Sequence, residues 1–483
     1  MNSNNMRDKV VSGLIWRFSE RILAQLVTFV VTIVLARLLA PESYGAIAIV
    51  NIFIVLANIF VTGGFGNSLI QKKDSDDADF STVFYVGILM GVILYVILFL
   101  SAPFIASFYE MDILCPVLRV MGLKLILAGV NSVQQAYVSK NMLFRRFFWA
   151  TLGGTLGSAV VGISMAYMGF GVWALAAQYM FNSLIDTIIL WFTVKWRPKL
   201  IFSFERLKGL FSYGWKILAA SFVRNGYKEV RGLVIGKMYA PAALAHYDKG
   251  KSFPSMVITN IYVAIQSVIF PTMAKVQDNR IQLKAMTRRL VRIHSYTISP
   301  LLVGLALVAE PLIKLLLTEK WLLCVPYLQV FCVLLALEPI QTANLQAIKA
   351  LGRSDVYLKL EIIKKSLGLL ALIISARYGV WAIALGELLV EILAAGVNIY
   401  PNKKLIGYSY FEQIKDLFNS FVPLVLMCAA VLSINLLHIG TFFELVLKVL
   451  AGATAYILGS YIFKNDSFMY ICKLIDIKNI IKR

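Results

Sequence analysis

Residues 80–109, FSTVFYVGILMGVILYVILFLSAPFIASFY, contain no Asp, Glu, Lys or Arg. At about 1.5 Å per helical residue, this stretch is longer than the ~30 Å hydrocarbon core of a bilayer. Two further stretches, 43–71 and 417–443, share this lack of charge. The whole chain is 59% hydrophobic with a mean hydropathy of +0.76, which is more apolar than a soluble domain. The sequence therefore predicts a protein that crosses a membrane repeatedly.

The apolar segments number fourteen, and none alternates in polarity as a membrane β-strand does. Only helices and closed barrels satisfy their backbone hydrogen bonds in lipid, so we predict an all-α polytopic membrane protein with about fourteen transmembrane helices. The predicted spans are 11–38, 43–69, 80–108, 113–138, 147–168, 171–194, 208–238, 243–270, 286–317, 323–348, 356–377, 379–400, 417–437 and 441–463. The tail, 468–483, is expected to form a basic amphipathic helix on the membrane face.

The Lys and Arg residues favour one side of this arrangement. The N-terminus, the even-numbered connections and the C-terminal tail together hold 24 of the 47 basic residues. The opposite connections, with the last two residues of the spans before them, hold only Arg37, Lys237, Lys320 and Arg377. Because short cytoplasmic loops carry the positive excess, we expect both termini to lie in the cytoplasm. The first apolar segment is too long for a signal-peptide core and is expected to remain as the first transmembrane helix.

Composition argues against several other classes of protein. The net charge of +21 comes without a soluble basic domain or a nucleic-acid-binding motif, so we predict membrane lipid and not nucleic acid as a partner. The five cysteines form no CxxC pair and share no ligand spacing with the three histidines, so we predict no metal site or other cofactor. The phosphate-binding pattern GxxxxGK[ST] is missing, so direct use of ATP is not expected.

The two halves of the chain match each other at three places. The matched pairs, at offsets of 200, 208 and 208, are 39–41 with 239–241, 103–105 with 311–313, and 171–176 with 379–384. We therefore predict an N-terminal six-helix lobe at 1–200, a C-terminal six-helix lobe at 201–408, and helices 13 and 14 with the basic tail at 409–483. An even number of helices per copy makes the repeat parallel, with a cavity expected between the lobes.

Seven cations inside predicted spans are the main candidates for a binding site. Arg17 and Arg21 are four residues apart in the first helix, and Lys249 and Lys251 begin the eighth. In the seventh helix the spacing i, i+4, i+7 places three cations on one stripe, namely Arg224, Lys228 and Arg231. Facing lipid at about 3 kcal/mol each, the seven would cost ~20 kcal/mol.

These cations must therefore face water, acidic partners or an anionic ligand. Glu20, Glu229 and Asp248 are near enough in sequence to neutralise some of them, and those near the surface can extend to the interface. Three acids do not neutralise seven bases, however. The remaining positive charge in a cleft with low-dielectric walls would attract a polyanion, and the planar Arg side chain suits phosphate.

Two stretches resemble a known family. GLIWRFSERILAQLVTFVVTIVLARLLAPESYGAIAI at 13–49 and GFGNSLIQKKD at 64–74 resemble the start of Wzx-type bacterial polysaccharide (O-antigen or exopolysaccharide) flippases. These belong to the multidrug/oligosaccharidyl-lipid/polysaccharide (MOP) exporter superfamily. The pattern of fourteen helices in two six-helix lobes and a final pair also matches, so the resemblance covers nearly the whole chain.

The resemblance implies a transporter of the bacterial cytoplasmic (inner) membrane that is not an enzyme. Its substrate would be an undecaprenyl-pyrophosphate-linked oligosaccharide, with the pyrophosphate held in a cationic central cavity and the prenyl tail in lipid. The resemblance is also compatible with binding to other polysaccharide assembly proteins. The cavity cations carried over are Arg17, Arg21, Arg224, Lys228 and Arg231, whereas the family pattern does not fix Lys249 and Lys251.

Alternating access around a midplane site is the expected mechanism, with coupling to a proton or sodium gradient left open. The coupling candidates are acids within spans: Asp186, Glu387 and Glu391 first, with Glu338 and Glu361. Lys364 and Lys365 on the preceding helix offer a purely structural pairing for Glu387 and Glu391. A cation-coupled multidrug exporter of the same superfamily is the alternative function, and it should show a dominant membrane acid. Short external connections argue against a membrane glycosyl enzyme.

Overall fold

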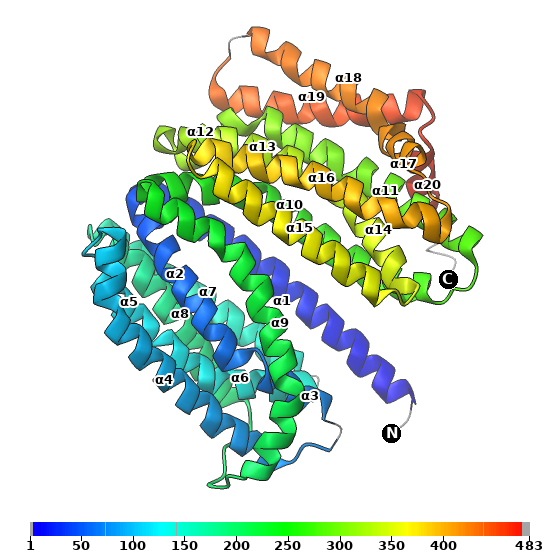
Figure 1. Ribbon diagram of the computed structural model, residues 1–483. Helices are drawn as coiled ribbons and strands as arrows, with labels where there is room; N and C mark the ends of the chain where they lie inside the picture. The colour runs from blue at the N-terminus through cyan, green and yellow to red at the C-terminus, as the bar shows by residue number, and fades with distance from the viewer. Residues whose placement is uncertain (1–2, 73, 142, 438, 476–483) are drawn as a thin grey trace. The chain divides into compact units, whose positions relative to one another are not determined.

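The computed structural model describes residues 3–72, 74–141, 143–437 and 439–475. Within these ranges the regular structure is helical and includes no β-strand (Figure 1), which confirms the all-α prediction. The chain forms two compact units, Met1–Ala245 and His246–Arg483. The predicted lobe boundaries at 200/201 and 408/409 remain a prediction.

The first unit contains helices α1 to α9. Helix α7 packs against α1 and α8, α4 packs against α5 and α6, and α9 packs against α2, α3 and α4. Aromatic residues around the buried Trp196, including Phe80 and Phe84, form part of its core. The bounds are α1 Ser3–Leu38, α2 Pro41–Thr62, α3 Phe65–Gln71, α4 Asp77–Tyr109, α5 Leu114–Gly122, α6 Lys124–Lys140, α7 Phe144–Tyr167, α8 Val172–Thr193 and α9 Phe204–Met238.

Helix α10, Pro241–Ala274, begins at the end of the first unit and continues into the second. In the second unit α11 packs against α13, α14 and α18, and α15 pairs with α16. The bounds are α11 Arg280–Leu307, α12 Ala309–Leu317, η1 Glu319–Cys324, α13 Val325–Leu335, α14 Glu338–Ala350, α15 Ser354–Ser375, α16 Val380–Ile406, α17 Tyr410–Leu417, η2 Phe418–Ser420, α18 Phe421–Ser433, η3 Ile434–Leu437, α19 Thr441–Ile462 and α20 Asp466–Ile475.

Every predicted span coincides with one helix or with consecutive short helices. Within the described residues, nine helical segments are long and apolar enough to cross a membrane. A tenth results if α17 and the run Phe421–Leu437, which are bent by 41° relative to each other, count as one span. The predicted segments outside this set are α1, α9, α10 and α15, and all four carry several charged residues. A multi-pass membrane protein is therefore established, whereas the count of fourteen spans is not confirmed.

The sequence repeat falls at equivalent structural positions. Pro41 and Pro241 are the first residues of α2 and α10. Proline suits this position because the backbone N–H that it lacks would have no acceptor within the helix. Gly171 and Gly379 directly precede α8 and α16, and both have a positive φ, 54° and 108° respectively. Side chains are strained in that region, so glycine is favoured at both places. The equivalent prolines and the positive-φ glycines at matching helix starts agree with the predicted duplication.

Helices α4 and α6 approach closely at small residues. A Cβ added at Gly91 of α4 would lie 2.6 Å from the carbonyl oxygen of Leu125 in α6. One turn earlier, Gly87 lies opposite Gly129, whose added Cβ would be 2.5 Å from the Gly87 carbonyl oxygen. Such small-xxx-small pairs let helix backbones touch. In membranes, close packing of this kind drives helix association, because lipid provides no hydrophobic effect between helices.

Buried carboxylates hold basic residues at helix ends in both units. In the first, the fully buried Asp79 side chain accepts from Lys72 Nζ at 2.6 Å and lies 3.4 Å from Arg206 Nη1. Asp76 and Asp79 also form the capping box that starts α4. These contacts tie α3, α4 and α9 together.

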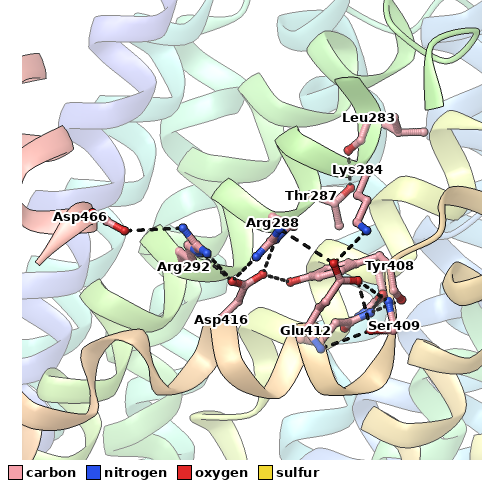
Figure 2. A network of polar contacts seen from close by, with 12 residues as sticks. Leu283, Lys284, Thr287, Arg288, Arg292, Tyr408, Ser409, Glu412, Asp416 and Asp466 are labelled. Carbon is pink, nitrogen blue, oxygen red and sulfur yellow. Dashed lines mark hydrogen bonds and ion pairs between the residues drawn. The ribbon is translucent and has the colours of Figure 1, made fainter. Parts of the chain in front are cut away.

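Figure 2 shows the corresponding cluster in the second unit, where α17 meets α11. The buried Asp416 carboxylate accepts from Arg288 Nε at 2.7 Å and from Arg292 Nε at 2.7 Å. The Tyr408 hydroxyl donates to the same carboxylate at 2.8 Å. One turn earlier, Glu412 accepts from Lys284 Nζ at 2.9 Å (Figure 2). The cluster fixes α17 on α11.

Candidate functional site

The basic stripe predicted for the seventh helix lies on α9. Arg224 and Lys228 are exposed, and neither makes an ion pair within the described part of the chain. Arg231 is half-buried, and its guanidinium carbon lies 5.4 Å from the centre of the Tyr227 ring. Because the helix repeats every 3.6 residues, the three cations follow one face of α9. In this stripe (Arg224, Lys228 and Arg231), the first two cations therefore have no acidic partner among the described residues.

The other predicted cations have different surroundings. Arg17 and Arg21 belong to α1, but their side chains lie outside the described residues. Lys249 in α10 is buried, with its Nζ 5.5 Å from the centre of the Trp321 ring. Lys251 lies 3.3 Å from Glu387 Oε1, so a predicted cavity cation and a predicted coupling acid form an ion pair.

The predicted coupling acids differ in their partners. Glu387 accepts a hydrogen bond from the Tyr247 hydroxyl at 2.6 Å as well as pairing with Lys251. Glu391, one turn further along α16, accepts from the side-chain amide of Gln341 in α14 and has no ion pair among the described residues. A carboxylate whose recorded partner is a neutral amide is better placed to exchange a cation than one that is already paired.

The remaining acids in spans also have partners. Lys364 forms its ion pair with Glu361 on the same helix, and no ion pair joins it to Glu387 or Glu391 in the described residues. Glu338 accepts from the Thr342 hydroxyl at 3.4 Å. Asp186 in α8 accepts from the Asn131 amide of α6 at 3.1 Å.

Asp186 also lines a cavity of about 630 Å³ within the first unit. Helices α2, α3, α6, α7 and α8 contribute to its wall, which carries mostly amide and hydroxyl groups among its polar side chains. Lys124 lines it too, with its Nζ 5.1 Å from the centre of the Tyr179 ring. The size is typical of a small-molecule site.

A family model described as polysaccharide biosynthesis protein matches residues 34–326, which is more than half of the chain. The chain belongs to the polysaccharide biosynthesis protein family. The match covers α9 with its basic stripe and every helix that lines the cavity of the first unit.

Curated relatives match the chain over most of its length. The lipopolysaccharide biosynthesis protein WzxC of Escherichia coli K12 is 24% identical over 426 residues, covering 86% of each chain. The teichuronic acid biosynthesis protein TuaB of Bacillus subtilis 168 is 25% identical, over 83% of this chain and 85% of its own.

Solved structures share the fold. The lipid II flippase MurJ in an inward closed conformation matches with a TM-score of 0.69 and 15% identity, over 94% of this chain and 99% of its own. An inward-facing multidrug resistance MATE family transporter of the MOP superfamily matches with a TM-score of 0.62 and 16% identity, over 81% of this chain and 98% of its own. The chain therefore shares the fold of these two transporters, as the family resemblance implied.

Sequence reasoning missed two features of the chain. The cavity of the first unit was not predicted, although amides recur at helical spacing in otherwise apolar segments, for example Asn51 with Asn58 and Asn131 with Gln135. The Asp416 cluster was also missed. Its signal was Arg288 and Arg292, four residues apart near the start of a predicted span.

Proposed function

We propose that this chain is a flippase that translocates undecaprenyl-pyrophosphate-linked oligosaccharide units across the bacterial cytoplasmic membrane, with both termini in the cytoplasm. The observation that carries the proposal is the stripe on α9, where Arg224 and Lys228 have no acidic partner in the described residues. The family match and the likeness to WzxC support a role in polysaccharide assembly.

A pyrophosphate provides what this stripe lacks. Its oxygens accept several hydrogen bonds, and an Arg side chain donates two parallel ones to a single phosphate group. Lys228, one turn from Arg224, would add a compact charge between the two arginines of the stripe. Arg17 and Arg21 remain proposed partners of the same pyrophosphate.

Transport would then proceed by alternating access, with the inward and outward states differing in affinity for the lipid-linked anion. Of the coupling candidates, Glu391 is favoured because its recorded partner is the neutral Gln341 amide. Glu387 already balances Lys251. A proton or sodium gradient remains the proposed energy source.

The test is inversion of an undecaprenyl-pyrophosphate-linked oligosaccharide in proteoliposomes. Transport is followed by the fraction of sugar that a membrane-impermeant oxidant, periodate, can reach. The variants are Arg224→Gln and Lys228→Gln. Each removes a charge-assisted contact of about 1.5–3 kcal/mol, which corresponds to roughly ten-fold to hundred-fold weaker substrate binding.

Lys237→Gln is the matched control, since Lys237 is also a cation of α9 but pairs with Glu110 at 3.0 Å. It should transport like wild type. Equal transport by all three variants would move the anion site away from the stripe. A wild-type protein that moves no such lipid but exports organic cations would instead be a multidrug exporter.

A further inference from the structure

We propose that the cavity of the first unit is the subsite that binds the sugar units of the transported lipid. The inference rests on the flippase function proposed above and adds a site to it. Three rows of polar side chains, each at helical spacing, converge on this space from α2, α6 and α8. They are Asn51 and Asn58, Asn131 and Gln135, and Asn182 and Asp186.

The type of side chain indicates the type of ligand. A side-chain amide offers donors and acceptors together, as a sugar hydroxyl does. Hydroxyl groups of Ser132, Thr151 and Ser183 add to the same wall. A ligand with many hydroxyls can therefore pair with this lining without bringing any charge of its own.

Two acceptors in the wall lack a partner in the described structure. The side-chain oxygens of Asn58 and Asn131 are both buried without a hydrogen bond. The Asn131 amide nitrogen is already used, since it donates to Asp186 Oδ2 at 3.1 Å. Buried polar atoms are nearly always paired in folded proteins, so these two residues of the wall hold hydrogen-bonding capacity that the protein itself leaves unused.

Charge favours a neutral polyhydroxyl ligand over an ion. One base, Lys124, and one acid, Asp186, line the cavity, so it has no formal excess of either sign. An anion would be drawn more strongly to the stripe on α9. A metal cation would be repelled by the Lys124 ammonium, and no cluster of three metal-ligating side chains occurs in the described residues.

The experiment measures binding of two lipids to the full-length chain in nanodiscs. One probe is the lipid-linked oligosaccharide isolated from the producing cells, and the other is undecaprenyl pyrophosphate without sugar. Asn58→Ala removes an unpaired acceptor, and Ala128→Phe fills the cavity from α6. Either variant should raise the Kd of the sugar-bearing lipid about ten-fold and leave that of undecaprenyl pyrophosphate within two-fold.

Matched controls place the same substitutions elsewhere. Asn141→Ala alters an exposed asparagine that donates to its own helix, and Ala453→Phe adds a ring at an exposed position on α19. Both should bind the two lipids as wild type does. If one cavity variant misfolds, the other still decides the outcome.

The outcomes separate this inference from the proposed function. A wild-type protein that binds neither lipid overturns the flippase proposal. Wild-type binding of both lipids with equal Kd overturns the sugar subsite alone, as do cavity variants that weaken both lipids equally or neither. Loss of sodium-22 binding in Asn58→Ala, with unchanged lipid binding, would reassign the cavity to a cation.

Discussion

The Asp416 cluster allows a stability prediction with an internal comparison. Asp416→Asn keeps the shape of the side chain and removes the charge that holds Arg288 and Arg292. Breaking one partner of a fully buried ion pair costs about 3–5 kcal/mol. Here the carboxylate is fully buried but the two arginines are about one-third exposed and can reach water, which reduces the cost. We expect a loss of about 2–3 kcal/mol in unfolding free energy.

Glu412→Gln is the comparison, because the same two helices carry a second ion pair one turn away. The Glu412 side chain is 34% exposed and its partner Lys284 is 27% exposed. A pair at this level of exposure is worth under ~1 kcal/mol. Glutamine also preserves the hydrogen bond by which Glu412 caps α17.

The assay should report on the second unit alone. Cys324 and Cys332 lie in that unit and are buried, so once Cys115, Cys428 and Cys472 are replaced by serine, maleimide reaction during titration with sodium dodecyl sulfate follows its unfolding. The Asp416→Asn midpoint should fall well below that of Glu412→Gln. Equal shifts for the two variants, or a change below about 0.5 kcal/mol for Asp416→Asn, would refute the argument from burial.

Three further predictions concern packing, pH and coupling. Gly91→Ala places a methyl group against the α6 backbone and should lower the unfolding free energy of the first unit by about 1–3 kcal/mol in a sodium dodecyl sulfate titration followed by circular dichroism, whereas Gly226→Ala, with open space around it, should not destabilise. The hydrogen bond from Arg206 holds the pKa of Asp76 well below its usual range. Its stabilising effect is therefore complete above the ordinary Asp pKa of about 4 and lost as pH falls through the folded-state value, so the difference in thermal midpoint between wild type and Asp76→Asn should shrink as pH is lowered from 5. Glu391→Gln should abolish the response of proteoliposome transport to an imposed pH gradient.

Helix positions were predictable because lipid requires long apolar segments, and charge interrupts them visibly. Each predicted span contains helical structure. Breaks within spans were not predicted, such as that between α5 and α6 at Leu123 or between α11 and α12 at Val308. Gly122 and Lys124 flank the first break, and Glu310 and Pro311 follow the second within three residues, but such residues also occur inside unbroken helices, as Pro103 does in α4. Such breaks depend on packing between helices, which hydropathy does not encode.

For the candidate site, the sequence identified charged residues but not their partners. The stripe on α9 followed from spacing alone. The pairing of Lys251 with Glu387 joins residues 136 positions apart, and helical periodicity carries no information about such contacts. Of the two predicted structural partners for Glu387 and Glu391, Lys364 instead pairs with the nearer Glu361 on its own helix, and pairing by Lys365 stays a prediction.

Basic residues in this chain fall into two physical classes, and the difference bears on function. Those near Asp79 and Asp416 are held by buried acids at helix ends, where they tie helices together. Arg224 and Lys228 lack such acids in the described residues, although their helix is long enough to carry them toward the middle of the membrane. Stability alone would favour acidic partners there too. Leaving the charge open lowers stability unless an anion binds, and in the proposed function the pyrophosphate of the transported lipid is that anion.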